Sequence, residues 1–140
     1  MRQREGDQFD RPDWDSYFFG IAKAVAARAD CRRARFGAVI VDVGHRVVAT
    51  GYNGSPPGGQ SCLSGECLRG LKSKAELPPG TPDYSDCIAL HAETNAIANA
   101  DAWRCAGSTI YIASLGDTAY PPCDMCAKLI RAAGIVRTVW

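Results

Sequence analysis

Apolar residues recur every three or four positions close to the N-terminal end of the chain. Within the segment DWDSYFFGIAKAVAARAD, this spacing is held by Trp14, Phe18, Ile21 and Val25. A repeat of that period places the apolar side chains on one face of a helix, and Asp or Ser at its start can cap it. We therefore predict an amphipathic helix over residues 14–29.

Short runs rich in β-branched residues predict the strands. FGAVIVD (36–42) and RVVATGY (46–52) are separated only by the turn-like residues 43–45, which is typical of an antiparallel hairpin. STIYIAS (108–114) and IVRTVW (135–140) are further runs of this kind. Each of these runs predicts one strand of a sheet.

Two further helices and one long loop complete the pattern. IALHAETNAIANA (88–100) and PPCDMCAKLIRAA (121–133) read as helices, and Gly134 ends the second. Residues 53–86 are dense in Gly, Pro, Ser and charge without a sustained period, so they predict a loop with one helical turn near 68–74. Strands that alternate with helices imply an α/β fold in which helices flank a sheet.

Length and charge define the class of protein. A chain of 140 residues fits one domain, which we assign to residues 13–140, with 1–12 as a polar N-terminal arm and 53–86 as a loop insertion. No stretch is typical of a membrane span or an export signal, so we expect a cytoplasmic protein. With 16 Lys and Arg against 15 Asp and Glu, the net charge of +1 gives no general attraction to nucleic acid.

The cysteines point to a metal. Seven is an odd number in a chain without an export signal, which favours free thiols or metal ligands over disulfides. Cys123 and Cys126 are three residues apart at the start of a predicted helix, so both sulfurs share one face and can bind one ion. Pro122 suits the first helical position, which would put both thiols at the positive end of the helix, where thiolates are favoured.

His91 and Glu93 are two residues apart, and side chains with that separation point to different sides of a helix. Both can reach one pocket only if His91 lies at the very start of its helix. Three ligands, His91, Cys123 and Cys126, would leave the fourth tetrahedral position of a zinc ion open for water, as in catalytic zinc sites. Glu93 would then act as general base toward that water and later as general acid.

The whole motif is more specific than its parts. H-A-E followed by P-C-x-x-C matches H-x-E…P-C-x-x-C, the pattern of zinc deaminases that act on bases. A redox CxxC pair and a zinc module without catalysis are the alternatives for parts of it. A redox pair usually follows a strand in a thioredoxin-like order, which this sequence does not show. The complete motif favours hydrolytic deamination.

In four blocks the chain resembles the cytidine and deoxycytidylate deaminase superfamily, and within it the deoxycytidylate (dCMP) deaminase branch. The blocks are WDSYFFGIAKAVAARADCRRARFGAVIVD, GYNGSPPGG, HAETNAI and PPCDMC. The resemblance implies a three-layer α/β/α fold with a mixed sheet of about five strands, a catalytic zinc ion, conversion of dCMP to dUMP and ammonia, and a homo-oligomer. It also implies that Asn53, Arg33 and Ala92 bind the substrate nucleotide.

Alternatives stay open for these contacts. Arg33 suits bidentate phosphate binding, but it could equally be a solvated charge in an Arg-rich turn whose other members, Arg28, Arg32 and Arg35, could share the task. Asn53 could instead supply the backbone geometry of an Asn-Gly turn.

The substrate also has alternatives. The segment LGDTAY is longer than the link common in the superfamily, so a modified cytosine nucleotide, a nucleoside or another aminated heterocycle is a second interpretation. A base in tRNA or in single-stranded nucleic acid is a third, and it would require a basic aromatic groove.

Four more cysteines, Cys31, Cys62, Cys67 and Cys87, lie in or beside the long loop. Some relatives carry a structural zinc ion in this region, so a second zinc is one interpretation, and it would order the loop. The other is that these are small buried residues, since unpaired Cys is among the most buried residue types. Cys105 lies between a helix and a strand and is most simply a packing residue.

Overall fold

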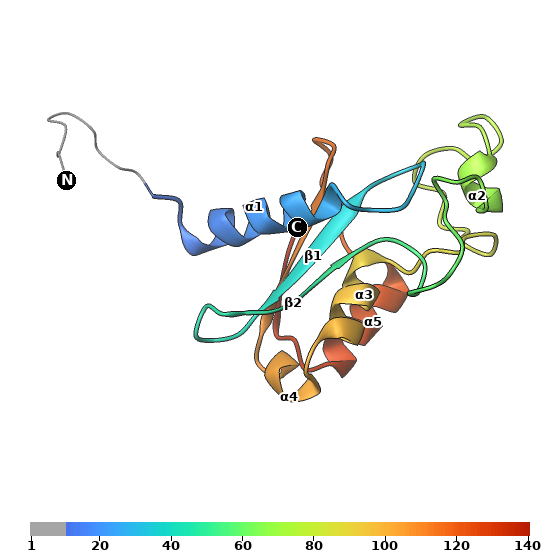
Figure 1. The fold of residues 1–140 in the computed structure, drawn as a ribbon. Helices are drawn as coiled ribbons and strands as arrows, with labels where there is room; N and C mark the ends of the chain where they lie inside the picture. Colours follow the sequence, from blue (N-terminus) through green and yellow to red (C-terminus); the bar gives the residue numbers. More distant parts are fainter. Residues whose placement is uncertain (1–10) are drawn as a thin grey trace, which may run out of the picture.

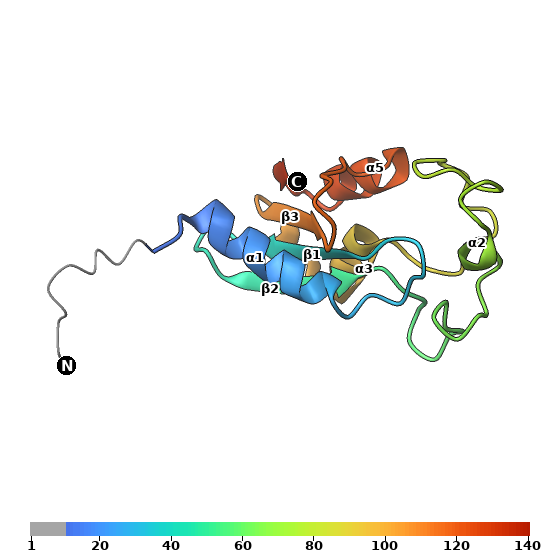
Figure 2. The ribbon, with the colours of Figure 1, turned by 90° about the horizontal axis from the view of Figure 1, so that it is seen from above.

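The computed structural model describes residues 11–140, so most of the arm predicted for residues 1–12 lies outside the described residues. A sheet separates one long helix from two others, which makes three layers (Figures 1 and 2). No helix in the described part of the chain is long and apolar enough to cross a membrane. The elements are α1 (Trp14–Ala26), β1 (Phe36–Val41), β2 (Val47–Tyr52), α2 (Leu68–Leu71), α3 (Ala92–Asn99), α4 (Ala102–Cys105), β3 (Thr109–Ser114), α5 (Asp124–Ala132) and β4 (Arg137–Val139).

Helix α1 lies against one face of the sheet and is shorter than predicted. Asp13 caps it, since its carboxylate accepts a hydrogen bond from the Ser16 N–H at 2.8 Å. The prediction extended the helix to residue 29, but regular helix ends at Ala26. The N–H groups of Arg28 and Ala29 bond three residues back, which gives tighter turns than an α-helix.

The sheet has the order β2-β1-β3-β4. β1 is antiparallel to β2 and to β3, whereas β3 is parallel to β4, so the predicted hairpin and mixed sheet are confirmed. Within residues 11–140 the sheet has four strands and not the expected number of about five. The residue pattern supplies four strand runs, and the fifth strand was implied only by the family resemblance.

Both faces of the sheet are apolar and covered. Alternation along β1 and β3 sends neighbouring side chains to opposite faces, so the same two strands build both halves of the core. Towards α1 the core contains Phe18, Ala22, Val39, Val41, Tyr111 and Ala113. Towards α3 and α5 it contains Ala38, Ile40, Ala92, Ala96, Cys105, Ile110, Ile112, Ile130 and Ile135.

Close contact with the sheet fixes the position of α3. A Cβ atom at Gly51 in β2 would overlap the backbone of α3 at Ala96, so glycine allows the helix to lie directly on the strand. The Asn95 side chain of α3 also donates hydrogen bonds to the carbonyl oxygens of Tyr52 and Gly54, at 2.8 and 3.2 Å. These contacts determine where the first turn of α3 lies.

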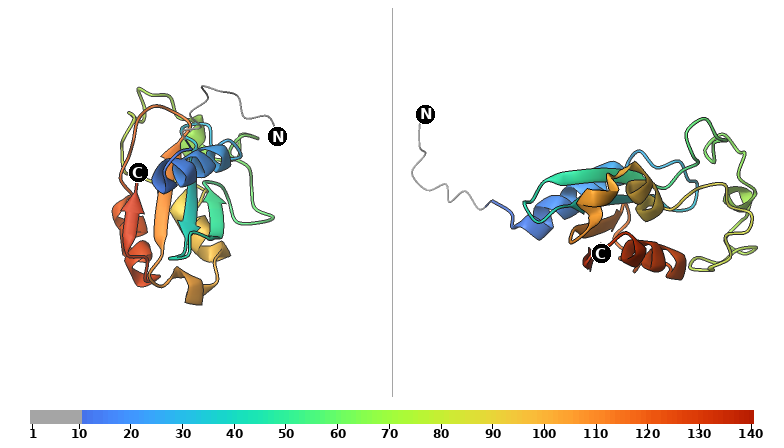
Figure 3. Two further views of the ribbon diagram at one scale, coloured as in Figure 1. Left: turned by 90° about the vertical axis from the view of Figure 1, so that its left-hand side faces the viewer. Right: turned by 90° about the horizontal axis from the view of Figure 1, so that it is seen from below.

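The long loop between β2 and α3 extends from one end of the molecule (Figure 3). Its helical turn, α2 (Leu68–Leu71), lies within the range predicted for it. Helix α4 (Ala102–Cys105) was not predicted; it is a single turn capped by Asp101. It carries Cys105 into the core at 1% exposure, which confirms Cys105 as a packing residue.

Candidate metal centre and active site

His91 immediately precedes α3, as the zinc interpretation requires. It is the N-cap residue, with extended backbone angles of φ −67° and ψ 157°, and its carbonyl oxygen accepts the first helical hydrogen bond from Asn95. The helix was predicted to begin at residue 88, but Leu90 forms an antiparallel bridge with Gly54. Because this bridge holds the chain extended, the helix begins only at Ala92 and the His91 ring lies at its start.

Cys123 occupies the corresponding position in α5. It is the N-cap residue, and its sulfur accepts a hydrogen bond from the Cys126 N–H at 3.5 Å. The placement of Pro122 at the first helical position was wrong. That position belongs to Asp124, because the Cys123 backbone is still extended and its sulfur does the capping. Both thiols nevertheless lie at the helix start, as predicted.

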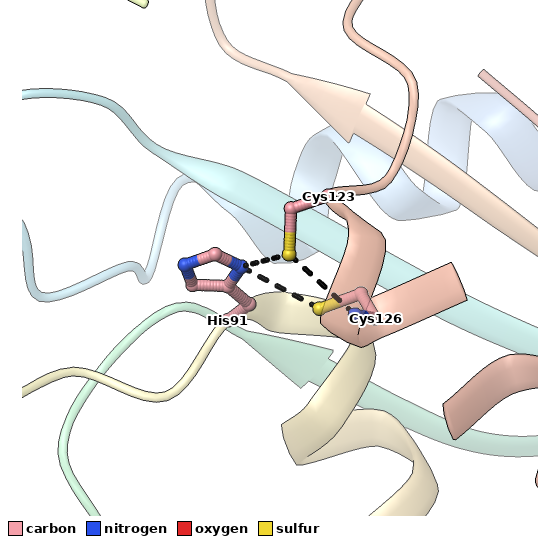
Figure 4. A group of neighbouring side chains, drawn as sticks. All are labelled: His91, Cys123 and Cys126. Carbon is pink, nitrogen blue, oxygen red and sulfur yellow. Dashed lines mark hydrogen bonds between the residues drawn. The ribbon is translucent and has the colours of Figure 1, made fainter. Parts of the chain in front are cut away.

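The two helix starts bring three donor atoms together (Figure 4). The His91 Nδ1 atom is 3.4 Å from the sulfur of Cys123 and 3.4 Å from that of Cys126, and all three atoms lie within 4.8 Å of one another. A tetrahedral zinc ion bound at about 2.1 Å to nitrogen and about 2.3 Å to sulfur would separate these atoms by about 3.6 Å. The donor set and its spacing therefore fit a zinc ion.

The electrostatics of Cys126 favour a metal ligand over a redox thiol. Cys126 is buried, and burial raises the pKa of its thiol to about 12, with the negative charge of Glu93 adding to the rise. Its sulfur also lies 3.6 Å from the Thr94 hydroxyl. Such a thiol ionises readily only beside a positive charge, which a zinc ion supplies.

Glu93 follows the metal-binding candidate His91 by two residues. It is the second residue of α3 and is only 7% exposed. The negative charge of Glu93 contributes to the raised pKa of Cys126, a member of the metal group formed by His91, Cys123 and Cys126. A carboxylate in the first turn of a helix is stabilised by the helix dipole. The predicted role of Glu93 in proton exchange stays a prediction.

Asn53 and Ala92, predicted to contact the substrate, are both buried. The Asn53 side chain fixes the start of β1, since its Oδ1 accepts from the Phe36 N–H at 2.7 Å and its Nδ2 donates to the Ala34 carbonyl at 2.8 Å. Ala92 packs its side chain into the core. As the first residue of α3, it has a backbone N–H without a helical partner, and only this group can bind a ligand.

Arg33 supports the long loop. Its Nη1 donates to the Lys72 carbonyl at 3.1 Å and its Nη2 to the Leu77 carbonyl at 2.5 Å. Arg32 likewise donates hydrogen bonds to the backbone carbonyls of Cys62 and Leu63. The guanidinium groups of this turn thus stabilise loop carbonyls, and phosphate contact by Arg33 stays a prediction.

The four loop cysteines are linked less tightly. Burial would raise the pKa of Cys67, but hydrogen bonds, among them those from the thiols of Cys62 and Cys87, lower it below its ordinary value. Backbone N–H groups also donate to the sulfurs of Cys31, Cys62 and Cys67, at 3.3 to 3.4 Å. In residues 11–140, the donors found within 4.8 Å of one another as a group of three belong to His91, Cys123 and Cys126 alone. The second zinc stays a prediction.

Two loop residues at the edge of the site were not predicted. The ring of Tyr84 packs edge-on against His91, with the centroids 4.7 Å apart, and the guanidinium of Arg69 lies 4.6 Å from the centroid of the Tyr84 ring. Both residues come from the segment without periodicity, where no pattern predicts which side chains turn inward. Only the aromatic and basic residue types in that loop could have suggested them.

Comparison with known proteins identifies the family. The family model for the cytidine and deoxycytidylate deaminase zinc-binding region matches residues 12–140. A protein of Mycobacterium phage D29 named deoxycytidylate deaminase is 44% identical over 134 residues, which cover 93% of this chain and 95% of that one. The deoxycytidylate deaminase of Schizosaccharomyces pombe is 38% identical over 130 residues, and the chain spans 37% of its length.

A solved structure agrees with the fold. The dCMP deaminase of cyanophage S-TIM5, in complex with dCMP and dUMP, superimposes with a TM-score of 0.65 at 23% identity, over 91% of this chain and 80% of that one. The zinc-binding region of the family model includes His91, Cys123 and Cys126, which the structure brings together. The chain belongs to the cytidine and deoxycytidylate deaminase family.

Proposed function

We propose that the protein hydrolyses the exocyclic amine of a cytosine nucleotide, converting dCMP and water to dUMP and ammonia. The observation that carries this proposal is the group of three metal-binding side chains, with a buried carboxylate, Glu93, two residues after His91. The deoxycytidylate deaminase of phage D29, similar over 95% of its length, supports dCMP as the substrate.

The metal group requires zinc for this chemistry. His91, Cys123 and Cys126 would hold the ion, and the Lewis acidity of zinc makes water a nucleophile near neutral pH. Three protein ligands would leave the fourth tetrahedral position of the ion open for water.

Glu93 moves the protons of the reaction. Its carboxylate takes one proton from the attacking water as the oxygen bonds to C4 of the base, and it delivers that proton to the ring nitrogen N3. The second water proton passes through the same carboxylate to the amine, which leaves as ammonia when the C4–N bond breaks. Its low exposure keeps bulk water from replacing it in these transfers.

We also propose which groups contact the substrate. We assign base or sugar contacts to the backbone N–H of Ala92 and to the second hydrogen of the Asn53 amide, whose first is bonded to Ala34. Arg33 is retained as a phosphate contact through the N–H groups that do not donate to Lys72 and Leu77. A homo-oligomer in the cytoplasm is the proposed setting.

Substitution of Glu93 by Gln tests the proposed function. Gln keeps the size of the side chain but cannot accept and return a proton, so ammonia release from dCMP should fall by at least about 100-fold while zinc per chain stays constant. Unchanged activity would instead indicate a zinc ion that only stabilises the fold.

The wild-type protein should be tested with CMP, deoxycytidine, cytidine, 5-substituted dCMP and guanine as well as with RNA hairpins. Preference for a modified cytosine nucleotide would favour the second interpretation of the substrate. Activity on the hairpins alone would favour a nucleic-acid deaminase.

A further inference from the structure

A stack of Tyr84 and Arg69 lies at the edge of the metal group and has no part in the proton transfers above. The Tyr84 and His91 rings meet at an interplanar angle of 77°. On the ring of Tyr84 lies the Arg69 guanidinium, as a cation–π pair. Tyr84 thus connects a fixed cation to the active site.

Two backbone contacts hold Arg69 in place. Its Nε donates to the Asp83 carbonyl at 2.9 Å and its Nη2 to the Thr81 carbonyl at 3.0 Å. These bonds use one edge of the guanidinium group. Nη1 carries two more N–H donors, and it makes no hydrogen bond to any residue between 11 and 140. The cation is therefore rigid, and one end of it is available to a ligand.

The charge of Arg69 is not neutralised by a direct ion pair. The ion pairs of the described residues are those of Lys72 with Asp86, Arg104 with Asp42 and Arg137 with Asp15. Asp83 is near, but its carboxylate accepts from the N–H and the hydroxyl of Ser85, which are the main cause of its lowered pKa. An anionic ligand would supply the missing partner.

Arg33 and Arg69 use different nitrogen atoms of the guanidinium group for their hydrogen bonds to the loop. Both Nη atoms of Arg33 donate to loop carbonyls, so the end of its fork is turned into the loop. Arg69 commits Nε and one Nη, which leaves Nη1 free. Arg69 is also the arginine that a side-chain contact through Tyr84 links to His91.

On the basis of the proposed function, we propose that Arg69 binds the 5′-phosphate of the nucleotide substrate and that Tyr84 positions it. With the cytosine ring at the metal group, the phosphate lies on the far side of the sugar, away from the metal ligands. The Arg69 guanidinium is also set apart from His91, because the Tyr84 ring lies against both of them. Arg69 would thereby distinguish a nucleotide from a nucleoside.

The test compares phosphorylated with unphosphorylated ligands. In Arg69→Gln, KM for dCMP should rise by about 10- to 100-fold, as expected for loss of a charged hydrogen bond, with kcat nearly unchanged. Deoxycytidine turnover should stay within about 3-fold of wild type. Calorimetry should give a matching loss of affinity for dUMP but not for deoxyuridine. The KM of Arg69→Lys for dCMP should lie between that of wild type and that of Arg69→Gln, because Lys keeps the charge without the planar fork.

Lys72→Gln is the matched control. It removes a cation from the same loop together with the contact to Asp86, and it should leave the preference for dCMP unchanged. Equal losses of dCMP and deoxycytidine turnover in Arg69→Gln would mean that Arg69 only supports the loop, and unchanged dUMP affinity would mean that it has no role. Either result overturns the inference. A wild-type protein that binds dUMP through Arg69 but deaminates no cytosine compound would refute the proposed function alone.

Discussion

Two groups of cysteines lie in different structural settings. Cys123 and Cys126 start a helix that packs on the sheet, and with His91 they form a group of donors within 4.8 Å. Cys31, Cys62, Cys67 and Cys87 lie in or beside a long loop with a single helical turn. The sulfurs of Cys31, Cys62 and Cys67 accept backbone N–H bonds, and Cys67 also interacts with the thiols of Cys62 and Cys87.

The difference shows how ligands become preorganised. At the metal group, the position of each ligand follows from contacts that do not involve a metal, such as the close contact of α3 with Gly51. In the loop, the chain is held by hydrogen bonds from arginine side chains to carbonyls, including those of Arg32 and Arg33. A loop held by such hydrogen bonds would become more ordered if it bound an ion. The metal group next to the sheet is already ordered before an ion binds.

The largest expected effect is that of Cys126→Ser. A hydroxyl is a poor substitute for a zinc thiolate, so the catalytic ion and all measurable deamination should be lost while the fold persists. Zinc per chain, ammonia release and far-UV circular dichroism check this. Cys105→Ala is the control, because it removes a buried cysteine of the core and should keep both zinc and activity. Retention of zinc by Cys126→Ser would contradict the assignment of the ligands.

The loop cysteines should respond differently. If they hold a second ion, the wild-type protein carries two zinc ions per chain, and Cys67→Ser should carry one. Hydrogen exchange over residues 53–86 should then quicken, while deamination falls by less than about 10-fold because the catalytic ligands stay in place. A single zinc ion per wild-type chain would show that the second zinc prediction is wrong and that these cysteines only pack.

The same contrast explains what could be predicted from the sequence. The periodic segments predicted the hairpin, the four strands and the three main helices, and the motif with His91, Cys123 and Cys126 predicted the metal group, whereas the mixed sheet was implied by the family resemblance. Pro122 was misplaced because a cysteine sulfur can cap a helix, which no propensity rule anticipates. Tyr84 and Arg69 were missed because loop side chains follow no period, and only tertiary contacts reveal where they point.

Gly51→Ala tests whether the sheet fixes the metal group. The added Cβ would overlap the α3 backbone, so the free energy of unfolding should drop by about 1–3 kcal/mol and kcat should fall as Glu93 moves from the metal group. Urea unfolding and steady-state kinetics measure the two effects. Gly20→Ala is the control, because its Cβ meets nothing within 4 Å and alanine favours the helix. Unchanged kinetics in Gly51→Ala would show that α3 does not depend on this contact.

The smallest effect is expected at the charge contact that ties α1 to β4. Asp15 accepts hydrogen bonds from Arg137 and from the Tyr111 hydroxyl, and these bonds lower the pKa of Asp15 from 3.8 to about 2. A lowered pKa means that the contact stabilises the fold above pH 3.8 and that this contribution is lost as the pH falls toward 2. The contribution is small because the pair is exposed to water.

At pH 5, Asp15→Asn should therefore unfold at a lower urea concentration than wild type. The difference between their unfolding midpoints should become smaller between pH 3.8 and pH 2. Zinc dissociates from both proteins in acid, so the difference between them isolates Asp15 from the metal ligands. Hydrogen exchange at pH 5 should place the change in α1 and β4 and leave the long loop unaffected. A change confined to the loop would mean that the sheet and the loop are energetically coupled, because a contact on the sheet alone could not produce it.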